Sequence, residues 1–323
     1  MEHCNVLITS CGRRVELVKA FMQAKQELNI SGIVVGADMS KYAPALYFCD
    51  KVELVPRLND SSYLDRLIEI INFNNINLVV PTIDTELQLL ADNKDLIESA
   101  TSAKVMISSS EVVRICNNKF LTAQFFKDNA FAIPYTLTQE DIDNKNYNFP
   151  LFIKPLNGSS SINAFKVNNQ KELDFFIDYI DQPIVQEMVS GEEYTIDAFI
   201  DFKGNILSVV PRIRIATRGG EVLKGQINLN KTIISDVTKM LKILKPIGHI
   251  TIQGFLGNDN IFRYIEINPR FGGGAPMSIS AGANTPKYLY QLLTNQKVEV
   301  GKIKDKAIFA RFDNSIMIEE NND

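Results

Sequence analysis

The sequence lacks the features that mark membrane-spanning, disulfide-rich or zinc-bound proteins. No apolar run approaches the roughly 18 residues that a membrane helix requires. The four cysteines form no CxxC pair and all lie in the first 116 residues, so we expect reduced thiols. No basic stretch precedes the first apolar run, which argues against a cleaved signal peptide. We therefore expect a cytoplasmic protein.

Positive charge is also in short supply. The chain has 34 lysines and arginines against 38 aspartates and glutamates, so its formal net charge is −4. Proteins that bind nucleic acid or anionic membranes are usually basic, and we expect neither partner. Any anionic ligand must then be met by a local cluster of cations. The 323 residues suggest about two domains, and the 45% hydrophobic content is ordinary for a globular enzyme.

Three common catalytic patterns are missing. The phosphate-binding loop GxxxxGK[ST] is absent, and so is the dinucleotide fingerprint GxGxxG. No Ser–His or Cys–His nucleophile pair is evident. The two histidines, His3 and His249, have no set of metal ligands around them in the sequence, and we expect His249 to be structural.

The first hundred residues alternate between strand and helix patterns. Apolar runs that predict strands lie at 5–9, 33–37, 76–80 and 105–107. Apolar spacing typical of helices lies at 15–22 and 64–71. This alternation predicts an α/β domain with a doubly wound parallel sheet, which we place at residues 1–112.

From about residue 117 the pattern changes to helices and antiparallel hairpins. Predicted helices lie at 119–128, 171–180 and 232–244, and predicted strands lie at 149–154 and 184–187. Two hairpins are predicted, the first from 193–201 and 205–213 and the second from 249–256 and 261–267. We divide this part into a small subdomain, 113–190, and a C-terminal subdomain, 191–323.

The strongest chemical signal lies on the second predicted hairpin. Glu266 and Asn268 project from the same strand face because side chains alternate with period two, and Gln253 lies on the preceding strand. Carboxylate and amide oxygens suit Mg²⁺. Arg270 follows, where its guanidinium could hold a phosphoryl group or a carboxylate. The alternative is a solvated sheet face, but Glu266 stands within an apolar run.

Two further clusters suit a nucleotide. Lys154 ends a predicted strand and precedes a loop of small residues whose backbone N–H groups can approach phosphates, namely Gly158, Ser159, Ser160 and Ser161. A strand then leads through Glu187 into the apolar connector Met188–Val189, whose main chain could pair with adenine, and Glu193 could accept from ribose hydroxyls. Taken singly, these residues also fit a serine-rich surface turn and surface acids beside a turn.

In order and spacing, these clusters resemble the ATP-grasp superfamily, and within it the carbamoyl-phosphate-synthase-like group of stand-alone carboxylate–amine ligases. The resemblance rests on Lys119, Ile153-Lys154-Pro155, residues 158–161 and 186–189, Glu193, Gln253 and the run Glu266-Ile267-Asn268-Pro269-Arg270. Residues 1–112 resemble the domain that precedes ATP-grasp modules. The resemblance implies a doubly wound N-terminal domain followed by two α+β subdomains that clasp the nucleotide.

The resemblance also implies a role for each position. The ATP phosphates would be contacted by Lys119 and Lys154 and covered by the loop of Gly158, Ser159, Ser160 and Ser161. The adenine and ribose would be held by Glu187, Met188, Val189 and Glu193. One or two Mg²⁺ ions, replaceable by Mn²⁺, would be bound by Gln253, Glu266 and Asn268, and the transferred phosphoryl group would be steadied by Arg270.

Other residues point to the substrate side. Arg212 and Arg214 share a strand face, and we expect one of them to recognise a carboxylate, the alternative being a basic face exposed to solvent. The turn at 10–14 follows a strand and opens a helix, which suits an anion. The run 84–86 is either a helix cap, which we favour, or the rim of an acceptor site.

The function that follows is an amide-forming ligase. It would convert ATP, a small-molecule carboxylate and an amine into an amide, ADP and phosphate through an acyl phosphate. The alternatives are bicarbonate activation of the carbamoyl-phosphate type, a kinase, or a nucleotide-sensing module without turnover. The homodimer is the commonest assembly of soluble proteins and stays open as an option here.

Overall fold

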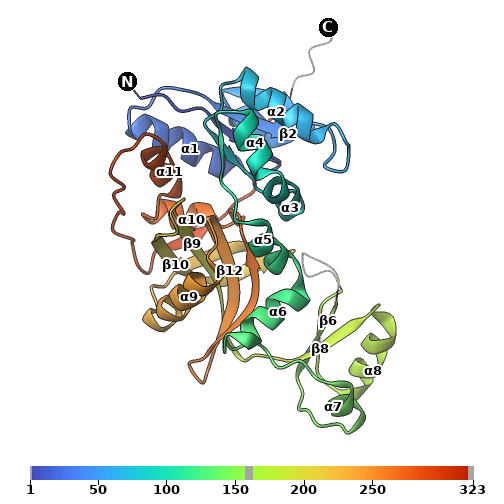
Figure 1. Cartoon of the computed structure of the whole chain (residues 1–323). Helices are drawn as coiled ribbons and strands as arrows, with labels where there is room; N and C mark the ends of the chain where they lie inside the picture. The colour runs from blue at the N-terminus through green and yellow to red at the C-terminus, as the bar shows by residue number, and fades with distance from the viewer. Residues whose placement is uncertain (1, 157–162, 319–323) are drawn as a thin grey trace.

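The computed structural model describes residues 2–156 and 163–318 (Figure 1). The chain begins with a parallel sheet whose strand order is β3-β2-β1-β4-β5. Its strands are β1 (Val6–Ile8), β2 (Val34–Asp38), β3 (Lys51–Leu54), β4 (Leu78–Val80) and β5 (Lys104–Val105). Its helices are α1 (Val15–Glu27), η1 (Pro44–Phe48), α2 (Tyr63–Phe73), α3 (Asp84–Asp92) and α4 (Lys94–Ala100). The predicted parallel α/β domain is confirmed.

Both faces of this sheet are covered. Val6 and Ile8 of β1 pack into a core with α1, whereas Leu7 between them packs into a second core with α2 and α3. Successive side chains on a strand point to opposite faces, so an uninterrupted apolar run is what a doubly covered strand requires. This explains why the strands read as short apolar runs in the sequence.

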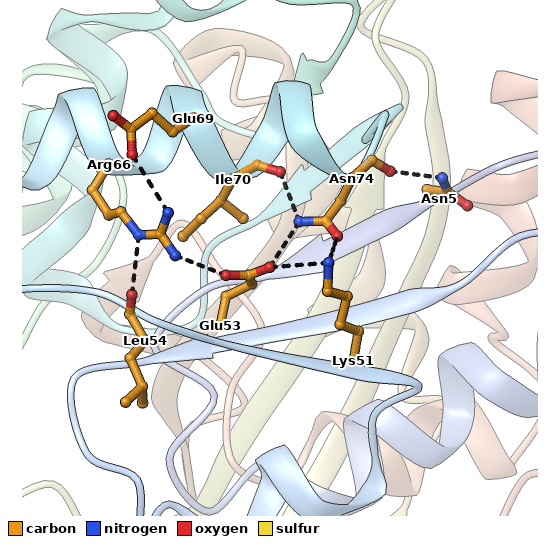
Figure 2. A network of polar contacts seen from close by, with 8 residues as sticks. All are labelled: Asn5, Lys51, Glu53, Leu54, Arg66, Glu69, Ile70 and Asn74. Atoms are coloured by element: carbon orange, nitrogen blue, oxygen red, sulfur yellow. Dashed lines mark hydrogen bonds and ion pairs between the residues drawn. The ribbon is translucent and has the colours of Figure 1, made fainter.

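The edge strand β3 is tied to α2 by a polar network (Figure 2). Glu53 on β3 accepts hydrogen bonds from Arg66 at 2.8 Å and from Asn74 at 3.1 Å, and Lys51 lies 3.3 Å away. Burial alone would raise the pKa of Glu53, but these hydrogen bonds and the charges of Lys51 and Arg66 leave it below its usual value. The network thus connects a half-exposed edge to the domain through charged groups.

The C-terminal half is built on an antiparallel sheet of order β13-β12-β9-β10-β11-β14, in the middle of the molecule (Figure 1). Its strands are β9 (Gly191–Ile200), β10 (Ile206–Arg218), β11 (Glu221–Ile227), β12 (Gly248–Gly257), β13 (Phe262–Asn268) and β14 (Ile308–Ala310). The two predicted hairpins are confirmed as β9–β10 and β12–β13. Helix α9 (Lys231–Leu244) buries its apolar side in the same core as the sheet.

Two helices that precede the small sheet in sequence also pack on the central sheet. These are α5 (Ser110–Asn117) and α6 (Lys119–Asp128), and Phe126 of α6 stacks on Tyr264 of β13 with ring centroids 4.6 Å apart. Residues 113–128 therefore share a hydrophobic core with residues of the C-terminal half. The boundary at residue 113 between the predicted domains stays a prediction.

A small antiparallel sheet of order β7-β6-β8 lies at the end of the molecule away from the first domain (Figure 1). It consists of β6 (Leu151–Pro155), β7 (Phe165–Val167) and β8 (Pro183–Glu187), with α7 (Gln139–Asp143) and α8 (Gln170–Tyr179) beside it. Strand β7 was not predicted. The predicted phosphate loop, Gly158 to Ser161, lies outside the described residues.

The end of the chain returns to the first domain. Helices α10 (Ala275–Ser280) and α11 (Thr285–Leu293) lie beside α1 (Figure 1). Phe21 of α1 meets Phe271 and Tyr290 edge to face, each with ring centroids 6.1 Å apart. The first and last segments therefore fold around one common core.

No helix in the described part of the chain combines the length and apolar character needed to cross a membrane.

Candidate active site

A cavity of about 490 Å³ opens beside β12 and β13, where the central sheet faces the first domain. Its lining combines oxygen donors with cations. Seven of the residues that the sequence singled out are brought together there, namely Lys119, Arg212, Arg214, Gln253, Glu266, Asn268 and Arg270. Residues from α3, α5, α6, β10 and β13 thus meet in one place, although more than 180 positions separate Asp84 from Arg270.

The three predicted metal ligands converge as expected from strand geometry. Gln253 on β12 is the direct partner of Glu266 on β13, and the register shifts just after this pair. Asn268 donates from Nδ2 to Glu266 Oε1 at 2.9 Å. Glu266 is exposed, and the other two side chains are half-buried. The set presents one carboxylate and two amides toward the cavity.

This donor set fits Mg²⁺ better than a softer metal. Its oxygen atoms are hard ligands, and one carboxylate leaves coordination positions for water and phosphate oxygens. In the described part of the chain, no three His, Cys, Asp or Glu side chains cluster as a metal site would require. A metal here would therefore depend on the two amides and on the nucleotide. Gln253, Glu266 and Asn268 as metal ligands stay a prediction.

Two lysines are electrostatically linked to Glu266. Lys119 is the first residue of α6, and Lys154 lies on β6 of the small sheet. Burial lowers the pKa of Lys119, and Glu266 acts against this shift. Burial also lowers the pKa of Lys154, where the charge of Lys119 adds to the effect and Glu266 again opposes it. Such a pair of partly desolvated ammonium groups suits a polyanionic ligand.

The predicted adenine and ribose residues are not among the described residues that line this cavity. Glu187 accepts from the backbone N–H of Tyr135 at 3.0 Å and lies 3.6 Å from Arg263. Glu193 pairs with Arg214 Nε at 2.9 Å. Among the described residues that line the large cavity, the structure places none of Lys154, Glu187, Met188, Val189 and Glu193. Their roles toward the nucleotide stay predictions.

The two strand arginines differ in how their guanidinium groups are used. Arg212 bonds to Asp197 Oδ2 through Nε at 3.3 Å and Nη2 at 3.1 Å, and its buried Nη1 has no hydrogen-bond partner among the described residues. Arg214 contacts Glu193, Thr195 and the carbonyl of Gly220. Their side chains are only 1% and 7% exposed, so the alternative of a solvent-exposed basic strand face is wrong. Arg212 keeps a free donor at the cavity.

A buried polar group lies behind Arg212. Asp197 of β9 accepts from Ser278 Oγ at 2.6 Å and lies 3.5 Å from His249 Nε2. Burial alone would raise the pKa of Asp197, but Arg212, His249 and Ser278 hold it well below its usual range. His249 also stacks on Phe271, with ring centroids 4.2 Å apart. This group fixes Arg212 against the loop at 272–274, where a Cβ on Gly274 would come within 2.8 Å of the guanidinium.

Arg270 is held by the first domain. Its Nη2 donates to Asp84 Oδ2 at 2.5 Å, and in the part of the chain that the structure describes its buried Nε has no hydrogen-bond partner. Glu86, in the first turn of α3, accepts from the backbone N–H of Thr82 at 2.8 Å and from that of the N-cap residue Ile83 at 3.4 Å. Glu86 thus takes part in capping the helix, as we favoured, and Asp84 and Thr85 line the cavity; the rim of an acceptor site stays a prediction.

Arg14 is a lining residue that the sequence reasoning did not assign to this site. It follows the turn after β1, at the carboxyl edge of the parallel sheet, where ligands of α/β domains commonly bind. The position of Arg14 after β1 could have indicated this site, but from it we predicted only an anion bound at the turn itself. The contact with the second half of the chain could not be inferred, because no local pattern records it.

Comparison with known families matches both halves of the chain. Residues 6–106 match the family described as PylC-like, N-terminal domain, and residues 116–274 match the family described as ATP-grasp domain. A carbamoyl-phosphate synthase of Methanobrevibacter smithii is 24% identical over 187 residues, which cover 56% of this chain and 48% of that protein. D-alanine–D-alanine ligase B of Clostridium perfringens is 23% identical over 206 residues, which cover 57% of this chain and 65% of that protein.

A solved structure shares the fold. The biotin carboxylase domain dimer of Hydrogenobacter thermophilus 2-oxoglutarate carboxylase, in complex with MgADP, ADP and bicarbonate, superposes with a TM-score of 0.71. The match covers 94% of this chain and 73% of that chain at 15% sequence identity, so it speaks to the fold alone. The chain spans less than two thirds of the length of each of the two sequence relatives above.

Proposed function

The chain belongs to the ATP-grasp superfamily of ATP-dependent ligases and carboxylases, and from this premise we propose that it is a carboxylate–amine ligase. In the first step, a carboxylate oxygen would attack the γ-phosphorus of ATP, giving an acyl phosphate and ADP. In the second, an amine nitrogen would attack the acyl carbon, release phosphate and lose a proton to solvent. The product would be an amide.

One observation carries the proposal. The cavity is lined by a carboxylate and two amides and by Arg212 and Arg270, each of which has a buried nitrogen without a hydrogen-bond partner among the described residues. An unpaired buried donor is costly unless a ligand satisfies it, so two such donors indicate an anionic ligand. A polyphosphate bound through a metal beside the carboxylate and amides, together with a carboxylate bound beside the arginines, would supply partners for both groups of residues.

Positioning and charge would do most of the catalytic work. Arg270 would contact the transferred phosphoryl group, and Asp84 would hold its guanidinium in place. Arg212 would bind the substrate carboxylate through Nη1, while Asp197 keeps the rest of its side chain fixed. When bound at Gln253, Glu266 and Asn268, Mg²⁺ would neutralise phosphate oxygens. Electrostatic stabilisation of this kind is usually the largest catalytic term.

Bicarbonate activation is the second candidate. It is favoured by the similarity to a carbamoyl-phosphate synthase and by the fold shared with a bicarbonate-bound carboxylase domain. The similarity to D-alanine–D-alanine ligase favours amide formation instead. The two reactions differ in the activated acid, and only an organic carboxylate would yield a stable hydroxamate when trapped.

A hydroxamate assay tests the proposal. The protein would be incubated with Mg·ATP, hydroxylamine and a panel of amino, hydroxy and uronic acids, with ADP followed in parallel. We expect ADP and hydroxamate to form together with at least one acid. ADP with bicarbonate and without hydroxamate would favour the second candidate. If neither any acid of the panel nor bicarbonate supports ADP formation, both candidates are contradicted.

Glu266→Gln is the matching variant. It removes the single carboxylate of the predicted metal set, and we expect turnover to fall on the order of 10²-fold or more. Because Glu266 is exposed, the thermal unfolding midpoint of the variant should stay near that of the wild type. Glu69→Gln, on an exposed face of α2, serves as the control and should keep full activity. Near-normal turnover of Glu266→Gln would contradict the metal assignment.

A further inference from the structure

A second, smaller cavity of about 210 Å³ lies between the first domain and the C-terminal half. The turn at residues 10–14 forms one wall, and Pro276 and Arg311 lie on the other. The small cavity shares four lining residues with the large one, which are Arg14, Glu221, Gly272 and Gly273. The two cavities therefore adjoin, and a molecule in the smaller one can extend into the larger one.

Cations exceed anions in the small cavity. Three arginines line it against two glutamates, a formal excess of one positive charge. Arg311 is already paired, lying 3.5 Å from Glu16 and 3.0 Å from Glu221. Arg13 and Arg14 form no ion pair with any carboxylate of the described residues. The unbalanced charge is thus concentrated on these two side chains.

Arg14 is the less solvated of the two. It is half-buried, and its Nη2 donates to the carbonyl oxygen of Thr82 at 3.2 Å. Burial and the neighbouring charge of Arg270 lower the pKa of Arg14, and the carboxylates of Glu221 and Asp84 oppose this shift only in part. A partly buried guanidinium beside a like charge is unfavourable without a compensating anion. Glu221 and Asp84 offset part of the charge around Arg14, and the lining of the small cavity keeps a formal excess of one positive charge.

The turn that carries these arginines is anchored by hydrogen bonds to buried carboxylates. Ser10 donates to the fully buried carboxyl of Glu86 at 2.8 Å, and the backbone N–H of Gly12 donates to Asp38 Oδ2 at 2.8 Å. Side chains on an anchored turn lose less freedom when they bind a ligand. Arg13 and Arg14 are thus presented by a preorganised segment.

We propose that the small cavity binds an oxyanion group of the acceptor amine, a carboxylate or a phosphate monoester, through Arg13 and Arg14. This inference rests on the proposed ligase function, in which Arg212 and Arg270 serve the activated carboxylate and the phosphoryl group in the large cavity. The amino group of the same molecule then reaches the shared boundary beside Glu221. The acceptor is accordingly an amine that carries its own anionic group, and ammonia or a simple alkylamine is a poor substrate.

Calorimetric titration of the full chain tests this proposal. The protein is first saturated with Mg²⁺ and the non-hydrolysable ATP analogue AMPPNP, so that the γ-phosphate position is filled. Inorganic phosphate and acetate are then titrated separately at constant ionic strength. We expect at least one of them to bind. Binding of phosphate alone assigns a phosphorylated amine, and binding of acetate assigns an amine that carries a carboxylate.

Two variants and one control locate the binding. Arg14→Gln should lower the affinity for the anion at least about tenfold, since one charge-assisted contact is lost. Arg13→Gln, at an exposed position that does not threaten folding, should weaken it about threefold or more, as for a solvated pair. Arg57→Gln, at an exposed site in the first domain, should leave the affinity unchanged. AMPPNP affinity should stay within about twofold in Arg13→Gln and Arg57→Gln, because neither residue lines the large cavity.

Three results would overturn the proposal. The first is that neither anion binds the AMPPNP complex. The second is that the anion binds equally well to wild type, Arg13→Gln and Arg14→Gln. The third is that AMPPNP displaces the anion. The last result would place the anion in the nucleotide pocket. The same titrations without nucleotide keep the variants informative if AMPPNP itself fails to bind. In that event the proposed ligase function fails by its own assay, separately from the anion site.

Discussion

Arg212 and Arg214 show how much a single side chain depends on its partners. Both stand on the same face of β10, yet each guanidinium nitrogen of Arg214 lies beside Glu193, Thr195 or Gly220, whereas Arg212 Nη1 has no hydrogen-bond partner among the described residues. The difference comes from Asp197, which binds only two of the Arg212 nitrogens. Period two predicted the shared face correctly, but it could not show which guanidinium would remain available.

Asp197→Asn tests this buried pair. Removing the carboxylate charge leaves Arg212 uncompensated, and we expect the free energy of unfolding at pH 7 to fall by about 3–5 kcal/mol. Urea denaturation measures it. Asp178→Asn, an exposed carboxylate on α8, is the control and should change stability by less than about 0.5 kcal/mol.

The pH dependence of that loss has a defined sign. The pKa of Asp197 is lowered in the folded state, so its contribution is present above the unfolded value of about 3.9 and is lost as pH falls through the folded pKa. The stability difference between wild type and Asp197→Asn should therefore be constant above about pH 5 and shrink below about pH 4. A difference that stays constant down to pH 3 would contradict the lowered pKa.

At the scale of single elements, local signals worked best where the geometry repeats. The hairpin β12–β13 was predicted from the turn-rich run at 257–260 between two strand patterns, and the structure pairs Gln253 with Glu266 across it. Strand β7 (Phe165–Val167) was missed because three residues cannot establish a period. Its pairing with β6 is decided by the neighbouring strand, not by its own composition.

The end of α9 offers a test of element stability. Lys245 terminates this helix in the left-handed region, at φ 53° and ψ 48°, and its N–H donates to Leu241. A side chain is strained there, so Lys245→Gly should stabilise the protein by about 0.5–1 kcal/mol. Lys239→Gly, exposed within the same helix, should destabilise it by about 1 kcal/mol. Chemical denaturation compares them, and a loss of stability in both would refute the strain argument.

At the scale of the whole molecule, the first domain is not independent of the rest. Phe21 is completely buried, and the aromatic rings that it meets belong to Phe271 and Tyr290, about 250 positions later in the chain. The same interface carries the loop at 272–274 that lines both cavities. Folding of the common core and formation of the candidate site are therefore coupled.

Phe21→Ala tests this coupling. Truncating a buried phenylalanine typically costs about 3–5 kcal/mol, and we expect the whole chain to unfold in one transition shifted by that amount. Phe312→Ala, at a side chain that is 83% exposed, is the control and should have little effect. Circular dichroism during urea denaturation gives the measurement. Two separate transitions, with only the first shifted, would show that the halves fold independently.

The sequence by itself determined the alternating strands and helices of the first domain, the two hairpins and the shared face of Glu266 and Asn268. These features depend on side-chain periodicity within a few neighbouring residues, which the order of amino acids records directly. The tertiary structure alone decided that Asp84 holds Arg270, that Asp197 buries Arg212 and that Arg14 joins both cavities. Such contacts join segments far apart in the chain, and they form only when the packing of both halves brings those segments together.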